Sequence, residues 1–204
     1  VGLVGALLRD QQGLLSHAGI NFDLRCSSYH LLDGLLTVSK IANGMIPSAP
    51  VAAVTGALQW IERNTFLQHP FNSKYEVNGE DVELCLDVQE HLGQQVWLCT
   101  EASAIHNAET TRSQDPLQAG NSVDELRLRA RTRQFLENST GKQLRVLLQQ
   151  QQRESQLLRN ELDQEFGNAK QLHQRLLEQE TVLLSLREER LRLRDQLDAR
   201  EGYR

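Results

Sequence analysis

Few pairs of side chains in this sequence have a spacing that could support chemistry. In the stretch CSSYH, Cys26 and His30 stand four residues apart, which fits two metal ligands on one helix face. No CxxC or HxxxH motif accompanies them, so we expect no bound metal. In the stretch HNAE, His106 and Glu109 bring a base and an acid together, but no nucleophile stands beside them. The sequence therefore predicts no catalytic residue, no metal and no cofactor.

The stretch STGK, from Ser139 to Lys142, resembles the end of a phosphate-binding loop. The glycine that opens such a loop is missing, and Gln143 occupies the position where Ser or Thr would hold magnesium. The motifs HExxH and GxSxG are absent from the sequence as well. We therefore expect a protein that is not an enzyme.

Composition and charge divide the chain into two parts. Hydrophobic residues make up 39% of the 204 residues, which suggests that part of the chain stays outside a packed core. Residues 1–121 hold 6 basic and 13 acidic residues, whereas residues 122–204 hold 16 and 14. The second part is nearly neutral, and the alternating Arg127, Arg129, Arg131 and Arg133 indicate a solvated helix face. No nucleic-acid binding is expected.

Cysteine usage and hydropathy bear on location. Cys26, Cys85 and Cys99 form an odd and sparse set, which is typical of reduced thiols in the cytoplasm. An extracytoplasmic protein with a Cys85–Cys99 disulfide is the alternative. No run of about 18 apolar residues exists, so no membrane span is expected.

The sequence pattern predicts an all-α fold in which residues 1–108 form a small helical head. Pro50 fits the first turn of one helix, and residues 95–108 fit another. Trp60 and Trp97 are expected in the core of this bundle. Apolar residues recur at three- and four-residue steps within residues 3–18, 31–42 and 51–61.

Residues 75–88 carry two competing signals. An Asn-Gly pair between apolar runs is typical of a β-hairpin. Glu80, Asp81 and Glu83 instead suit the first turn of a helix, where the helix dipole favours anions. We expect a helix, with a short β-hairpin as the alternative. The same three carboxylates are the candidate docking site for a partner protein.

A long C-terminal coiled coil is predicted beyond the head. Residues 109–121 are polar, contain one proline and one glycine, and are expected to form a linker. Residues 122–200 are predicted to form a coiled-coil rod with a break near residues 138–141. Ser122 is expected to begin its first helix.

A heptad pattern supports this rod from Leu144 onward. The a and d positions of the heptad form the seam along which two helices meet. Of the sixteen such positions between residues 144 and 197, eleven are apolar. Gln149, Gln150 and Gln152 fall on outer positions of this heptad, and only Gln151 meets the seam. The expected core residues are Leu144, Leu148, Leu158, Leu162, Leu172, Leu176, Leu183, Leu186, Leu193 and Leu197.

A second row, Leu177, Leu184 and Leu191, repeats beside this seam and favours a bundle of more than two helices, although a simple dimer stays open. We therefore expect a non-enzymatic adaptor subunit of a multiprotein assembly. It would form homo- or hetero-oligomers through its coiled coil and dock another protein through its head. The alternative is an extracytoplasmic component of a bacterial secretion or surface apparatus.

Overall fold

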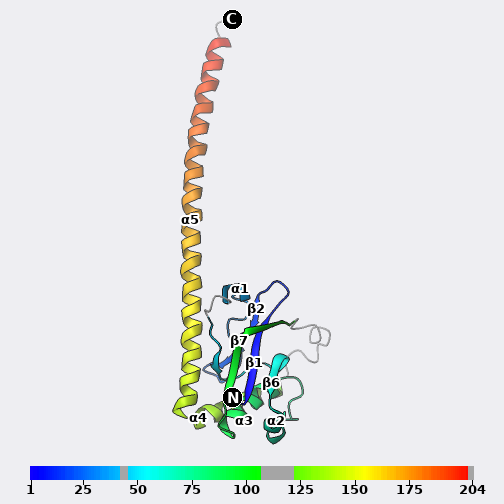
Figure 1. Ribbon diagram of the computed structural model, residues 1–204. Coiled ribbons are helices and arrows are strands. Elements are labelled where there is room, and N and C mark those ends of the chain that lie inside the picture. The colour runs from blue at the N-terminus through cyan, green and yellow to red at the C-terminus, as the bar shows by residue number, and fades with distance from the viewer. Residues whose placement is uncertain (42–45, 107–121, 202–204) are drawn as a thin grey trace. The chain divides into compact units, whose positions relative to one another are not determined.

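The computed structural model describes residues 1–41, 46–106 and 122–201, and side chains within residues 1–39, 46–106 and 122–196. It divides into two compact units, Val1–Ser155 and Gln156–Arg204. The first unit combines a β-sheet with helices, and the second contains the C-terminal part of one long helix (Figure 1). The fold is therefore mixed α/β, and the all-α prediction is wrong.

The first unit is built on a mixed sheet of five strands in the order β2-β1-β7-β5, with β6 also paired to β1. Strands β1 and β7 are parallel and lie side by side (Figure 1), and the other pairings in this sheet are antiparallel. Strands β3 and β4 form a separate two-stranded hairpin. The strands span Leu3–Arg9 (β1), Leu15–His17 (β2), Ile20–Phe22 (β3), Ser28–His30 (β4), Ala49–Val51 (β5), Gln59–Ile61 (β6) and Val96–Ile105 (β7).

Helices accompany this sheet in the first unit, and the last of them, α5, continues into the second unit. Helix α3 packs against both α4 and β7. Helix α4 ends at Asn138, and α5 begins at Gly141. The helical segments are Val38–Ile41 (α1), Gly56–Leu58 (η1, a 3-10 helix), Arg63–Gln68 (α2), Glu80–Glu90 (α3), Ser122–Asn138 (α4) and Gly141–Glu201 (α5).

The predicted helical bundle in residues 1–108 is wrong, because this region contains the strands of the sheet. The prediction failed because the sequences of β1 and β7 resemble those of helices. Strand β1 is buried on both faces, since Leu3, Leu7 and Leu8 are each no more than 2% exposed. Strands buried on both faces read as continuous apolar runs, which periodicity alone does not separate from helices. The short helix predicted over residues 95–108 is largely β7 instead.

Two local features also differ from the expected bundle. Pro50 lies in β5, at the edge of the sheet, where a strand tolerates a residue without a backbone N–H. Trp60 lies on β6 with 66% of its surface exposed, so it is not a core anchor. By contrast, α3 confirms the helix expected at Glu80, and the β-hairpin alternative for residues 75–88 is wrong.

The coiled coil predicted for residues 122–200 is wrong as a description of this fold. Helices α4 and α5 are separate, and α5 is a single long helix. In the described part of the second unit, no other helix accompanies α5. The predicted linker, residues 109–121, lies outside the described residues.

Candidate functional site

The first unit, which we call the sheet unit, includes the first fifteen residues of α5. A glutamine joins this part of α5 to the strands. The carboxamide oxygen of Gln150 accepts a hydrogen bond from the backbone N–H of Ala52 at 2.7 Å, just after β5. The Gln150 amide group donates to the carbonyl oxygen of Ile20 at 3.3 Å. Gln150 is only 3% exposed, and it satisfies one backbone group just after β5 and another in β3. The heptad pattern placed Gln150 on an outer, solvated position of the rod, so this role was not predicted.

A tyrosine extends the same contact at the β3–β4 hairpin. The hydroxyl of Tyr29 lies 3.0 Å from a carboxylate oxygen of Glu154 and 3.1 Å from the carboxamide oxygen of Gln151. Asn21 also donates to Gln151, at 3.3 Å. Burial and the Glu154 carboxylate raise the pKa of Tyr29 to about 12. A neutral tyrosine therefore holds α5 at this point.

The face of α5 that docks differs from the face that carries the leucines. Val146 and Leu147 are half-buried beside the buried Gln150. Leu144 and Leu148 are 46% and 56% exposed. At about 100° per residue, the two faces are separated by roughly a third of a turn. Leu144 and Leu148 therefore stay exposed in the first unit, whereas Gln151 on the same face of α5 contacts the β3–β4 hairpin.

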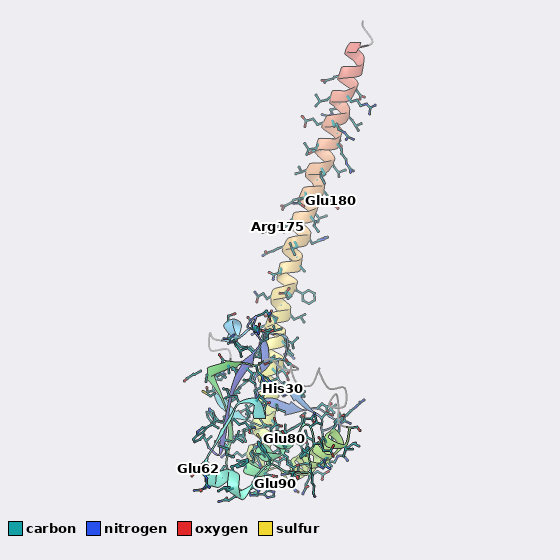
Figure 2. All side chains as sticks on the ribbon, turned by 90° about the vertical axis from the view of Figure 1, so that its right-hand side faces the viewer. His30, Glu62, Glu80, Glu90, Arg175 and Glu180 are labelled. Atoms are coloured by element: carbon teal, nitrogen blue, oxygen red, sulfur yellow. The ribbon has the colours of Figure 1, made fainter. Side chains whose placement is uncertain are left out.

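The second unit exposes the same leucine face along the rest of the helix. We call Leu144, Leu148 and the following heptad leucines the leucine seam. The side chain of Leu197 lies outside the described residues. Figure 2 shows Arg175 and Glu180 pointing outward from this part of α5. The seam leucines of this unit are between 38% and 60% exposed, and they are Leu158, Leu162, Leu172, Leu176, Leu183, Leu186 and Leu193.

The three acidic residues predicted to dock a partner lie together at the start of α3. Each is half-buried. Asp81 accepts the backbone N–H of Gly56 at 2.6 Å. Glu83 accepts the hydroxyl of Tyr75 at 2.5 Å and the amide group of Asn72 at 2.8 Å. Asp81 and Glu83 therefore bond to other groups of the first unit, and the role of the three carboxylates in docking stays a prediction.

Arg131 does not lie on a solvated face, because it joins α4 to α3. Its guanidinium group is 2.8 Å from Asp87 and 2.6 Å from Glu90, and its side chain is only 12% exposed. Asn138 also donates to Glu90, at 3.1 Å. Burial would raise the pKa of Glu90, but Asn138 and Arg131 stabilise the carboxylate and hold that pKa below its usual value.

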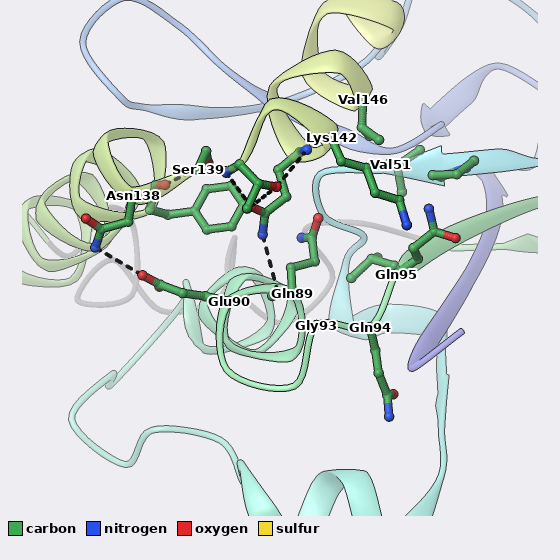
Figure 3. Close-up of a pocket in the computed structure, with 15 residues that line it drawn as sticks. Val51, Gln89, Glu90, Gly93, Gln94, Gln95, Asn138, Ser139, Lys142 and Val146 are labelled. Carbon is green, nitrogen blue, oxygen red and sulfur yellow. Dashed lines mark hydrogen bonds between the residues drawn. The ribbon is translucent and has the colours of Figure 1, made fainter.

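A pocket of about 300 Å³ lies between the end of α3, β5 and the corner where α4 meets α5 (Figure 3). Val51, Val96 and Phe135 contribute apolar walls, and amide and hydroxyl side chains contribute much of the rest. Lys142, from the STGK stretch, lines it, whereas Glu90 in its wall is already paired with Arg131. The arrangement provides polar contacts but no paired acid and base.

Two histidines face each other across β2 and β4. The Nδ1 atoms of His17 and His30 are 3.4 Å apart, and the backbone N–H of Thr55 donates to Nε2 of His17 at 3.4 Å. Burial, then the charges of His30 and His106, lower the pKa of His17 to about 3. Among the described residues, no three His, Cys, Asp or Glu side chains converge as metal ligands.

The cysteines are free, including the Cys85–Cys99 pair of the alternative interpretation. Cys26, Cys85 and Cys99 all carry unbridged thiols. Cys26 and His30 do not belong to any group of three or more potential metal ligands among the described residues. Burial raises the pKa of the Cys85 thiol, which keeps it protonated and unreactive near neutral pH. None of the helices in the described residues is long and apolar enough to cross a membrane.

Comparisons with protein-family models, with curated proteins and with solved structures found no match to this chain.

Proposed function

We propose that this protein is a non-enzymatic adaptor subunit of a multiprotein assembly, in which the leucine seam of α5 binds helices of other subunits. The single observation that supports the proposal is the exposure of that seam. In the second unit, every described leucine of the seam has at least 38% of its surface exposed. Burying this row of exposed leucines is the main driving force available for helix association.

The second row, Leu177, Leu184 and Leu191, widens this binding surface. These leucines are between 50% and 59% exposed. A single partner helix covers a narrow seam, so a wider stripe suits contact with more than one helix. The proposal therefore includes homo- or hetero-oligomers built around α5.

The sheet unit would carry a second interaction in such an adaptor. Its sequence is acidic, with Glu80, Asp81 and Glu83 at the start of α3, which would steer a basic partner toward it. Cytoplasmic localisation is part of the proposal, because three free thiols suit a reducing compartment.

The test expresses two variants of the full chain in the native source and cross-links each one chemically to its neighbouring proteins. Quantitative mass spectrometry then measures the amount of each captured protein. Leu176→Ser with Leu183→Ser should remove the partners that contact α5. Gln174→Ser with Glu188→Ser changes the same helix outside the seam and should leave those partners in place. Circular dichroism should confirm that both variants stay helical. If both variants capture the same partners in the same amounts, the leucine seam is not the binding surface.

A further inference from the structure

The seam of the second unit contains two charged residues. Glu165 and Arg190 occupy seam positions between leucines, and both are exposed in the single chain. Helix association would remove them from water, which is costly for an unpaired charge. Polar residues at such positions are known to fix the register and orientation of associating helices. A partner helix would therefore have to place opposite charges against Glu165 and Arg190.

We propose that α5 associates with α5 of a second copy of this chain in antiparallel orientation, with Glu165 of one copy facing Arg190 of the other. The inference rests on the proposed function and specifies its partner. A two-fold axis at the midpoint between Leu177 and Glu178 relates Glu165 to Arg190 of the other copy. The same axis creates the contact twice, as a symmetric interface requires. Each buried carboxylate then faces a guanidinium group.

Four leucines of the seam fall into contact in the same register. Leu172 of one copy meets Leu183 of the other, and Leu162 meets Leu193. These pairs share the two-fold axis that relates Glu165 to Arg190. The register therefore pairs these leucines with one another and the two charged residues with each other, while Leu176 faces Gln179 beside the axis.

A parallel pairing of the same helices places like charges together inside the seam. Glu165 would face Glu165, and Arg190 would face Arg190. Neither charge would then have an opposite charge in the seam, and each pair would be partly desolvated. The antiparallel register removes both conflicts at once.

The flanking charges act in the opposite direction but are weaker. Parallel helices would place Arg175 beside Glu180 of the other copy, whereas the antiparallel register brings Arg159 near Arg194. All four side chains are exposed in the single chain, and they would stay on the rim of the paired helices. Exposed ion pairs are screened by solvent and contribute little, so the seam charges decide the orientation.

The leucines of the second row lie outside this two-helix seam. Leu177, Leu184 and Leu191 would stay exposed on the paired helices, where the other subunits of the assembly could bind. The antiparallel pair is thus the core to which those helices would add.

Sedimentation equilibrium of the full chain tests the charge pairing. Glu165→Arg alone and Arg190→Glu alone should each weaken self-association roughly tenfold or more, because each places like charges together in the antiparallel seam. The double variant Glu165→Arg/Arg190→Glu should restore association to near the wild-type level. Glu188→Arg makes the same charge change outside the seam and should have little effect.

The outcomes separate this inference from the proposed function. If the chain self-associates but the single variants match wild type, the antiparallel register is wrong while an adaptor role for α5 still stands. If the wild-type chain stays monomeric at high concentration, the second copy is not the partner. The cross-linking of other proteins through Leu176 and Leu183 then decides whether the adaptor role survives.

Engineered disulfides report the orientation independently of charge. In a Cys26→Ser/Cys99→Ser background, Ala169→Cys with Leu186→Cys should form interchain disulfides, because the same two-fold axis relates these positions. Ala169→Cys alone should form few. Efficient cross-linking by the single variant would show parallel helices and overturn the proposal.

Discussion

The carboxamide oxygen of Gln150 lies 2.7 Å from the backbone nitrogen of Ala52 and accepts its hydrogen bond. Gln150 stands in a run of four glutamines, and its neighbours Gln149 and Gln152 are exposed. Gln150 and Gln151 thus serve as hydrogen-bonding partners for the sheet unit. Gln149 and Gln152 are solvated, which gives a matched pair of control substitutions.

Replacing Gln150 by Leu should destabilise the sheet unit. The substitution leaves the Ala52 N–H without its partner in a buried site, at a cost of about 1–3 kcal/mol. Gln149→Leu and Gln152→Leu change the same residue type on exposed faces and should each cost less than about 0.5 kcal/mol. Urea unfolding followed by tryptophan fluorescence measures this, because both tryptophans lie in the first unit. Equal stability of all three variants would contradict the docking role of Gln150.

Protonation of His17 should destabilise the sheet unit in mild acid. Its pKa is about 3 in the folded chain and near 6.5 when exposed, so the unfolded state binds the proton more strongly. Stability should therefore fall as the pH drops from about 6.5 toward 3, by up to about 1.4 kcal/mol per pH unit. In His17→Gln this part of the slope should disappear, whereas His173→Gln on the exposed helix should keep it. Urea unfolding at several pH values measures the slopes.

Asp124 should control stability at lower pH. Its fully buried carboxylate accepts the backbone N–H groups of Glu76, Val77 and Asn78 at 3.0, 2.8 and 3.3 Å, and it pairs with Arg127 at 3.0 Å. Burial would raise the pKa of this carboxyl, but these donors outweigh burial and lower it. The stabilisation is therefore present above about pH 4 and is lost as the pH falls through the lowered value.

Asp124→Asn tests this effect, because it retains the shape but removes the charge. We expect it to cost about 2–4 kcal/mol at pH 7 and to flatten the acid-induced loss of stability below about pH 4. Asp163→Asn, at an exposed position of α5, is the matched control and should change neither quantity. An acid profile of Asp124→Asn that parallels wild type at every pH would show that Asp124 does not carry this dependence.

Local signals in the sequence identified the helices better than the strands. The acidic first turn predicted α3, and Ser122 was the expected start of α4. Thr140 and Gln143 form reciprocal hydrogen bonds at the start of α5, which are the contacts of a capping box. These signals depend on residues only a few positions apart, so they are visible in a single sequence.

The sheet was not predicted because its strands pair with partners that are far away in sequence. Strand β1 pairs with β7, which lies about ninety residues further along the chain, and no local pattern reports that partner. Strands β2 to β6 are three residues long, too short for alternation to be recognised. Gln150 was assigned to solvent for the same reason, since its partners Ala52 and Ile20 lie far away in sequence. The leucine spacing along α5 is local and can be read from the sequence, whereas its role in helix association stays a prediction.

Two glycines should respond in opposite directions to an added methyl group. A Cβ atom at Gly5 in β1 would lie 2.6–2.8 Å from the side chain of Val54, which is itself fully buried. At Gly167 in the exposed part of α5, an added Cβ would meet nothing within 4 Å. Gly5→Ala should therefore destabilise the sheet unit by about 1–3 kcal/mol through overpacking. Gly167→Ala should stabilise α5 by about 1 kcal/mol, because alanine loses less backbone entropy in a helix.

A double-mutant cycle tests the cause of the Gly5 effect. Val54→Ala alone opens space beside Gly5 and should destabilise the unit, but Gly5→Ala in that background should cost much less than in the wild type. Urea unfolding gives the two costs, and thermal melts monitored by circular dichroism report the gain at Gly167. If the cost of Gly5→Ala is unchanged when Val54 is alanine, contact with Val54 is not what excludes a side chain at residue 5.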